Sequence, residues 1–514
     1  MGLQFTASPP HLALRTERGG PLTVTQQQLL MLDREISSGN VLNMSYAVAV
    51  DGPLNLSALE GALRDLAGRH EPLRSVHFTT HGVARSVVRG EELFLCGVDL
   101  KPKAVGNLTE GAVLAIEERD KKFDIARETP MRTVVLELPG GRHVLLLTFH
   151  HICVDGWSLS VLCRDVSRLY SARIRNQAAT LAPMAAQCIE QAQWQKDWLM
   201  SDKAEREMQW WMGKLHALPS ARLFPGEQSF QLDGEIFRQV LALPKELMDE
   251  LGKFARRTPV SLYALLLAGF NVLVSHWTRC TDVVIGSLVA NRPTAASSYI
   301  LGAHYNVILI RTDLSGEQTL AEVILRTKES TESTLDHQSL PYAVLAQKIG
   351  WNFDSKPLPE VMFQFDNYPL KQLSLEGTQI TGLYFDNLGL LEGEASLGKM
   401  HAVTTADLTF FVREMSGHFT VSALYRRGSI QDGRILGLLR SYVGILTAMV
   451  DRPETPLDEL QQFSSEDCIR DASLVTGQSS VPGLRPVTFL SPVEALSPVS
   501  PRLPNGTIAI GACP

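Results

Sequence analysis

Two adjacent histidines followed by an acidic residue are the part of this sequence best suited to chemistry. His150 and His151 open the segment HHICVDGWS, which runs through Asp155 and Gly156 to Ser158. A neutral imidazole, with an ordinary pKa of about 6.5, can take a proton from an attacking amine or hydroxyl. It can also orient the nucleophile and stabilise developing charge without full proton transfer. The sequence leaves both roles open.

The residues after the histidines offer a carboxylate and a tight turn. Asp155 can orient an imidazole, or it can pair with an arginine and lock the turn. Gly156 permits a tight return of the chain, and Ser158 can cap the helix that follows. A lone histidine in an apolar setting is usually structural, but two histidines followed by Asp-Gly-Trp-Ser at a strand–helix junction favour a functional role.

An apolar strand and an amphipathic helix must position this segment. Residues 143–149 (HVLLLTF) are a compact apolar run typical of a buried strand, and residues 158–173 carry leucine and valine at helical spacing. Side chains alternate along a strand, so His150 and His151 are expected to point in opposite directions, one toward a cleft and one inward.

Helix and strand signals alternate in the rest of the chain. Residues 57–69 predict an amphipathic helix capped by Ser57, and residues 183–216 predict a long, Trp-rich helical region. Residues 282–287 and 307–311 predict strands. This mixed order predicts α/β layers.

One apolar stretch approaches the length of a membrane span. Residues 260–277 include four polar residues and follow Pro259, so they predict a buried helix rather than a membrane helix.

Composition excludes several other classes of protein. The net charge of -7 gives no sign of a nucleic-acid-binding surface. Seven scattered cysteines without a C-x-x-C pair fit a reduced, cytoplasmic setting and give no zinc-ligand spacing. The N-terminus lacks the apolar region of a signal peptide. We therefore expect no nucleic-acid partner, no membrane and no bound metal.

Several blocks in order resemble the condensation-domain family of nonribosomal peptide synthetases. His150 to Gly156 match its H-H-x-x-x-D-G signature, which other chloramphenicol acetyltransferase-like enzymes share. Residues 69–78 (RHEPLRSVHF) are similar to R-H-E-x-L-R-T-x-F, and residues 337–342 (HQSLPY) to H-Q-D-x-P-F. Further matching blocks lie at residues 21–32, 52–54, 123–132, 290–292, 302–311, 361–364 and 407–409.

The resemblance implies an α/β fold of two chloramphenicol acetyltransferase-like lobes, a V-shaped pseudo-dimer with the active site at the junction. It implies a leader over residues 1–20, an N-terminal lobe over 21–190, a C-terminal lobe over 191–465 and a linker-like, Pro-rich tail over 466–514. A tunnel is expected to admit a donor acyl-pantetheine arm from one side and the acceptor from the other.

The resemblance also implies roles for single residues. His151 takes the catalytic position, and the backbone N–H of Gly156 is a candidate oxyanion donor. His150 is expected to pack inward, and Asp155 to pair with an arginine, for which Arg74 is the candidate. Trp157 and Ser158 complete this orienting set.

The chain departs from the family pattern near the expected crossover between the lobes. His304 and Tyr305 stand where Phe and Val are usual, and Val307 replaces Thr. We take His304, Tyr305 and Asn306 as candidates for the substrate channel, and the departures favour an unusual acceptor.

The implied function is to form an amide, or secondarily an ester, in nonribosomal peptide or other secondary-metabolite biosynthesis, including antibiotics. An acyl thioester on the phosphopantetheine arm of a carrier protein would react with a small amine or alcohol, and no bound cofactor is expected. The sequence contains no G-G-x-S carrier site and no adenylation-type S-G-T-T-G loop, so we expect the carrier in trans, or the chain to be part of a larger assembly. The alternatives are an acyl-CoA-dependent acyltransferase, a related epimerase and a non-catalytic recruitment domain.

Overall fold

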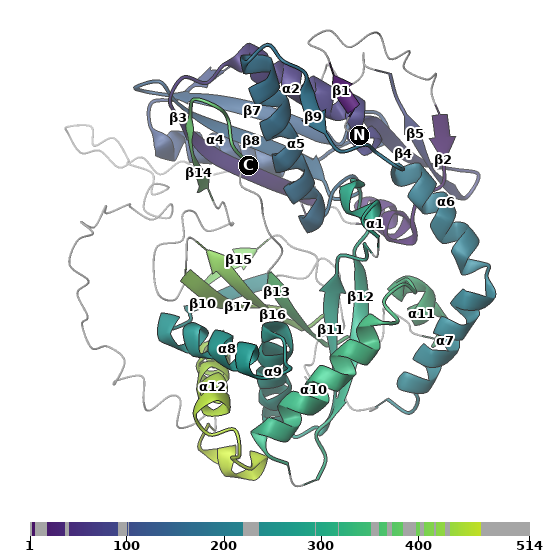
Figure 1. Ribbon diagram of the computed structural model, residues 1–514, viewed down its shortest axis with the longest axis vertical. Coiled ribbons are helices and arrows are strands. Elements are labelled where there is room, and N and C mark those ends of the chain that lie inside the picture. Colours follow the sequence, from purple (N-terminus) through teal and green to yellow (C-terminus); the bar gives the residue numbers. More distant parts are fainter. Residues whose placement is uncertain are drawn as a thin grey trace, which may run out of the picture. The chain divides into compact units, whose positions relative to one another are not determined.

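A computed structural model of the chain shows a mixed α/β protein (Figure 1), which confirms the predicted fold class. The predicted tail, residues 466–514, lies outside the described part of the chain. The structure describes residues 3–5, 18–35, 41–90, 100, 102–218, 236–292, 294–316, 318–350, 359–366, 373–383, 397–400, 406–415, 418–426 and 432–463.

A five-stranded sheet carries the histidine pair at the end of its central strand. Strand β8 (Arg142–His150) pairs antiparallel with β3 (Asn43–Asp51) on one side and β7 (Met131–Leu138) on the other. The edges are β14 (Gln379–Leu383) and β6 (Lys103–Ala104). The predicted strand at residues 143–149 is therefore confirmed.

The two faces of this sheet are covered by different helices. Leu145, Leu147 and Phe149 of β8 belong to a core shared with α2 (Leu56–Arg69) and α5 (Gly156–Ile174). Val144 and Leu146 belong to a smaller core with Ala115 of α4 (Leu108–Asp120). Because successive side chains point to opposite faces, one continuous apolar run supplies both cores.

The caps of α2 and α5 differ from the prediction. Asn55, not Ser57, is the N-cap of α2, and its side chain accepts a hydrogen bond from Ala58 N at 2.9 Å. Asp155, not Ser158, is the N-cap of α5. The capping residue lies two residues before the predicted one in α2 and three residues before it in α5. From there its side-chain oxygen can reach an N–H of the first turn.

Two short strands lie within the predicted leader. Strand β2 (Arg18–Gly20) pairs with β5 (Val83–Val88), which in turn pairs with β4 (Ser75–Thr80). Strand β1 (Leu3–Phe5) pairs with β9 (Ala179–Leu181). The residues of these two strands are held by inter-strand hydrogen bonds.

The second half of the chain builds a seven-stranded sheet. It contains β11 (Asp282–Val289) and β12 (Asn306–Asp313), as predicted. The sheet order is β12, β11, β13 (Val361–Asp366), β16 (Leu408–Met415), β17 (His418–Arg426), β10 (Ile236–Ala242) and β15 (Leu397–Met400). One large core joins this sheet to α8 (Lys245–Arg257), α9 (Leu262–Thr278), α10 (Leu320–Leu335), α11 (Tyr342–Lys348) and α12 (Asp432–Asp451).

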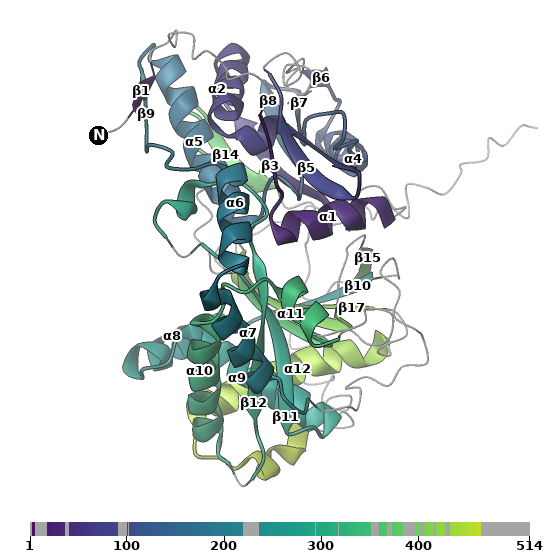
Figure 2. The ribbon, with the colours of Figure 1, turned by 90° about the vertical axis from the view of Figure 1, so that its right-hand side faces the viewer.

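The predicted Trp-rich helical region is present as two helices. Figure 2 shows α6 (Cys188–Leu199) followed by α7 (Asp202–Lys214). The break falls at Met200 and Ser201, where the Ser201 side chain caps α7. The predicted lobe boundary at residue 190 falls inside α6, and the first sheet receives β14 from the second half of the chain. The domain boundaries remain a prediction.

The apolar stretch near residue 260 forms α9, and eleven of its residues are buried. Among the described residues, no single helix has both the length and the apolar composition of a membrane span. Helices α8 and α9 meet those criteria only as a pair, bent by 115°.

Candidate active site

The turn between β8 and α5 holds the predicted catalytic segment. Asp155 has extended backbone angles, and its Oδ1 accepts hydrogen bonds from Ser158 N at 2.9 Å and Ser158 Oγ at 2.8 Å. A carboxylate here accepts a hydrogen bond from one of the unpaired N–H groups at the start of α5, and the positive end of the helix dipole stabilises its negative charge. Ser158 is thus a donor to the cap.

His151 has one ring nitrogen fixed by the backbone. Its Nδ1 lies 2.8 Å from the carbonyl oxygen of Val154. A carbonyl only accepts, so Nδ1 carries the proton and Nε2 is left with a lone pair. Within the described part of the chain Nε2 has no hydrogen-bond partner, and the side chain is only partly buried. The ring therefore has the tautomer of a general base.

His150 points the other way and is 1% exposed. Its Nδ1 accepts from Ile152 N at 3.1 Å, so Nε2 carries the proton that faces Asp33 Oδ1 at 3.4 Å. Burial lowers the pKa of His150, although Asp33 opposes this effect. A neutral ring packed edge-on against Phe123 suits the inward-packing role that we expected.

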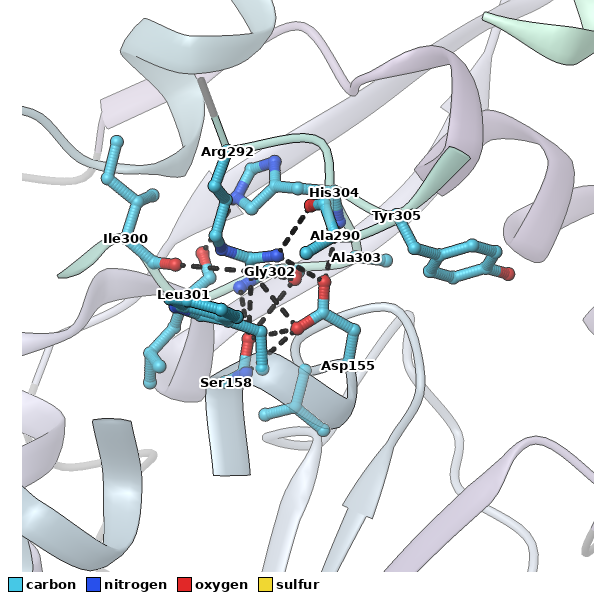
Figure 3. Close-up of polar contacts among 12 residues, drawn as sticks. Asp155, Ser158, Ala290, Arg292, Ile300, Leu301, Gly302, Ala303, His304 and Tyr305 are labelled. Carbon is cyan, nitrogen blue, oxygen red and sulfur yellow. Dashed lines mark hydrogen bonds and ion pairs between the residues drawn. The ribbon is translucent and has the colours of Figure 1, made fainter. Parts of the chain in front are cut away.

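Asp155 pairs with an arginine from the second half of the chain (Figure 3). Arg292 Nη1 lies 2.9 Å from Asp155 Oδ2, and Nη2 lies 3.0 Å from Oδ1. The predicted partner, Arg74, is wrong: its Nε and Nη1 donate to the carbonyls of Ala67 and Arg89. Arg74 follows α2 in a short 3-10 helix, where its own chain supplies acceptors.

The ion pair sits in a dense polar cluster. Burial would raise the pKa of Asp155, but the charge and hydrogen bonds of Arg292, with smaller contributions from His304 and the Ser158 N–H, lower it to about 2. Arg292 also lies near the carbonyl of Gly302 at 3.3 Å. The carboxylate therefore orients the loop after β11, whereas the Val154 carbonyl orients the His151 imidazole.

Gly302 is a position that a larger residue would not fit. Its φ is +144°, and an added Cβ would lie 2.6 Å from His304 Nε2 and 2.9 Å from Cys188 Sγ. The close approach lets the Gly302 backbone meet Ser158 and Arg292 directly.

The start of α5 also carries Gly156 and Trp157. Gly156 is the first residue of α5, so its N–H belongs to the first turn, where helical N–H groups have no acceptor in the helix itself. Trp157 Nε1 donates to Ser298 O at 3.0 Å, a further contact between the two halves of the chain. Trp157 therefore connects the first turn of α5 to the segment at Ser298.

The three channel candidates lie in different surroundings. Tyr305 is the one at His151: the ring centroids are 5.1 Å apart with an interplanar angle of 33°. His304 is buried, and its Nε2 donates to Leu301 O at 3.3 Å. Asn306 donates to the carbonyls of Gln338 and Leu340 and accepts from Tyr342 N.

Of these three residues, only Tyr305 thus remains a candidate for the substrate channel. The side chains of His304 and Asn306 are occupied by backbone groups in the interior, which contradicts a role in contacting substrate. Burial, followed by the charge of Arg292, lowers the pKa of His304 to about 4, so this ring is neutral at physiological pH.

Helix α1 (Val24–Glu35) connects the catalytic turn to Tyr305, and sequence reasoning missed this. Gln26 Nε2 donates to Ile152 O at 3.0 Å, and Thr25 Oγ1 donates to Tyr305 O at 3.1 Å.

Sequence reasoning also missed His77. In the block R-H-E-x-L-R-T-x-F, which begins at Arg69, His77 takes the ninth position, where the pattern has Phe. The replacement of an apolar ring by an imidazole was the available signal.

In the described residues, no group of three His, Cys, Asp or Glu side chains is arranged to hold a metal ion. The described cysteines Cys153, Cys163, Cys188 and Cys280 are free thiols.

The sequence is similar to segments of much longer synthetases. Tyrocidine synthase 3 of Brevibacillus parabrevis is 27% identical to the chain over 472 residues, which cover 90% of the chain and 7% of that relative. Malpinin synthetase of Mortierella alpina is 30% identical over 403 residues, which cover 75% of the chain and 5% of that relative. The chain thus spans less than a tenth of the length of either protein.

Solved structures show the same fold. One is the complex of the X-domain and OxyB from teicoplanin biosynthesis, with a TM-score of 0.72, 21% identity, and coverage of 86% of this chain and 95% of that one. Another is the first condensation domain of the calcium-dependent antibiotic synthetase with substrate analogue 3a, with a TM-score of 0.69, 19% identity, and coverage of 86% and 98%. The model of the condensation domain family matches residues 17–468, and the chain therefore belongs to the condensation domain family.

Proposed function

We propose that the protein transfers an acyl or aminoacyl group from the thioester of a carrier protein to a small amine, forming an amide. An alcohol acceptor, giving an ester, is the secondary form of the same reaction. The carrier acts in trans and delivers the acyl group on its phosphopantetheine arm. Membership of the condensation domain family supports this reaction class.

The observation that carries the proposal is the state of the His151 imidazole. The Val154 carbonyl holds the proton on Nδ1, which leaves the Nε2 lone pair on a partly exposed edge of the ring. The acceptor nitrogen or oxygen would attack the thioester carbonyl with its own lone pair, and Nε2 would take the proton that this atom loses. Positioned general bases contribute about 100- to 10,000-fold in rate.

The tetrahedral intermediate needs stabilisation of its oxyanion. We assign this to the backbone N–H of Gly156, which lies five residues after His151 at the start of α5. A first-turn N–H is free to donate, and the positive end of the helix dipole adds to its effect. Collapse of the intermediate would then break the C–S bond, and the proton taken by His151 Nε2 would pass to the departing thiolate, which leaves as the thiol of the carrier.

Tyr305 is the residue that we assign to the acceptor side of the site. Its ring faces the His151 imidazole, and burial raises the pKa of its hydroxyl, which keeps it a neutral hydrogen-bond donor. A tyrosine takes more space beside the base than the valine that is usual in the family pattern. It therefore favours small or slender acceptors.

Two rival functions use the same fold. An acyltransferase that takes acyl-CoA would use the same pantetheine arm, so the geometry at His151 serves both donors. A docking domain without catalysis is the other rival, because the X-domain, which has this fold, was solved in complex with OxyB.

Intact-mass analysis of acyl carrier proteins and acyl-CoA with a panel of amines and alcohols tests the proposal. The expected result is loss of the acyl mass from the carrier, with an amide product, in the presence of the wild-type protein. Transfer from acyl-CoA alone would support the first rival. No transfer from any donor, with stable binding of a carrier or enzyme partner, would support the docking function.

A further inference from the structure

A cavity lies beside the residues that the His150 ring contacts, Asp33 and Phe123. Its volume is about 420 Å³, and α1, β4 and the segment before β7 supply its lining. The lining consists of Leu30, Asp33, Arg34, His77, Lys122, Phe123, Asp124, Ile125, Ala126 and Glu128. His151 is not among these lining residues, so the cavity is separate from the His151 ring.

His77 is the unusual member of the lining. It is 1% exposed, and neither ring nitrogen has a hydrogen-bond partner among the residues that the structure describes. A buried imidazole without partners is costly, because it has lost its hydrogen bonds to water. The family pattern R-H-E-x-L-R-T-x-F has Phe at the position of His77. A phenyl ring has nearly the same shape and would avoid that cost.

One water molecule can satisfy only part of this ring. A much smaller cavity of about 10 Å³ also touches His77 and is lined by Gln26, Ser75 and Ser86 among others. It has room for about one water, which can serve one ring nitrogen. The larger cavity is the other space that His77 lines, so a partner for the second nitrogen can come from its occupant.

The charges around the larger cavity are ordered by depth. The carboxylate of Asp33 is the least exposed, at 16%, while the side chains of Lys122, Glu128 and Asp124 are 45%, 40% and 52% exposed. Asp33 Oδ1 has only a long contact of 3.4 Å to His150 Nε2 and a distance of 3.9 Å to Lys122 Nζ. The carboxylate therefore retains acceptor capacity for a ligand.

Two of the remaining charged groups of the rim already have partners, and Arg34, which is exposed and has none among the described residues, can extend into solvent. Glu128 Oε1 accepts from Arg132 Nη2 at 2.9 Å and from Asp124 N at 2.6 Å. Lys122 Nζ donates to the backbone oxygen of Asp33 at 2.9 Å. The deeper groups left to recognise a ligand are the Asp33 carboxylate and the neutral His77 imidazole, beside the apolar side chains of Leu30, Phe123 and Ile125.

We propose that this cavity binds a small primary amine with an apolar body. The ammonium group donates to Asp33 and to the unprotonated nitrogen of His77, and the apolar body packs on Leu30, Phe123 and Ile125. Burial lowers the pKa of His77 to about 3, so the ring stays neutral and does not repel a cation. Binding here involves no bond formation at His151 and is independent of the proposed reaction.

Calorimetric titration of the full chain with three matched probes tests this site. The probes are 2-phenylethylamine, its neutral analogue 2-phenylethanol and the anion 3-phenylpropionate. We expect saturable binding of the amine and at least tenfold weaker binding of the other two. Equal or tighter binding of the alcohol or the anion, or no saturable binding of the amine, would overturn the proposal and leave water as the occupant.

Variants then locate the binding site. Asp33→Asn is expected to weaken amine binding at least tenfold, and His77→Phe several-fold. Asp124→Asn changes an exposed carboxylate of the same rim and should leave amine binding unchanged. His151→Ala should also bind the amine as the wild type does, which separates this cavity from the catalytic centre. Unchanged binding to folded Asp33→Asn, or loss of binding in His151→Ala, would refute the assignment. The three-probe comparison on the wild type holds even if a variant does not fold.

Discussion

Arg292 and Asp155 form a bidentate ion pair between positions 137 residues apart in the sequence. Both side chains are almost fully buried, at 2% and 4% exposure. The pair fixes the start of α5, which carries Gly156, against the loop that leads to Tyr305. The geometry of the catalytic turn thus depends on a residue from the other half of the chain.

Replacement of Arg292 tests this dependence. Arg292→Leu leaves the Asp155 carboxylate buried without its partner, which is expected to reduce the free energy of unfolding by about 3–5 kcal/mol. The measurement is chemical denaturation of purified protein. As a control, Arg175→Ala removes an exposed pair with Glu376 and should change stability much less, because water screens that pair. Equal effects of the two variants would mean that the Asp155 pair does not organise the fold.

Stability should also depend on pH through His304. Burial and Arg292 lower its pKa from 6.5 to about 4 in the folded state. The unfolded chain therefore binds a proton that the folded chain does not, and stability is lost as the pH falls from 6.5 to about 4. A difference of this size corresponds to roughly 3 kcal/mol.

The readout for His304 is the difference between two pH profiles. Denaturation of the wild type and of His304→Asn between pH 7 and pH 4 should show a smaller acid-induced loss for the variant. Parallel profiles would show that this histidine does not contribute.

The cap of α2 gives a matched pair of variants. Asn55→Ala removes the acceptor for Ala58 N and is expected to destabilise the protein by about 1 kcal/mol. Ser57→Ala changes an exposed residue inside the helix and should alter stability by less than about 0.5 kcal/mol. Thermal or chemical unfolding measures both, and a larger loss for Ser57→Ala would contradict the observed cap.

Tyr305 should shield the His151 ring. Tyr305→Val removes the aromatic contact and is expected to speed modification of His151 by diethyl pyrocarbonate several-fold, whereas Tyr305→Phe should behave as the wild type. Peptide mass mapping measures the rate, with the exposed His216 as internal reference. An unchanged rate for Tyr305→Val in folded protein would remove Tyr305 from the site.

Local elements could be predicted from the sequence because their patterns are complete within a few residues. The apolar run of β8, the helical spacing in α5 and the buried stretch of α9 each contain the information for their own structure. The contrast between His150 and His151 followed from strand alternation alone.

Contacts distant in sequence could not be predicted in this way. Arg292 belongs to a block that we recognised, but nothing local connects it to Asp155, and Arg74 was an equally plausible arginine. His304 and Asn306 lie beside Tyr305 in the sequence, yet the structure buries their side chains against backbone groups and leaves Tyr305 at His151. The Asp155 cap was missed because Ser158 was taken as the cap, while Asp155 was considered only as a partner of an imidazole or of an arginine.

The most direct test of the account is the acyl-transfer rate of His151→Ala, measured by intact mass on a loaded carrier and an accepted amine, beside His216→Ala as a matched control. We predict a loss of about 100-fold or more for His151→Ala, with unchanged folding and carrier binding, and an unchanged rate for the control. A folded His151→Ala protein that transfers the acyl group at the wild-type rate would contradict the assignment of His151 as the base.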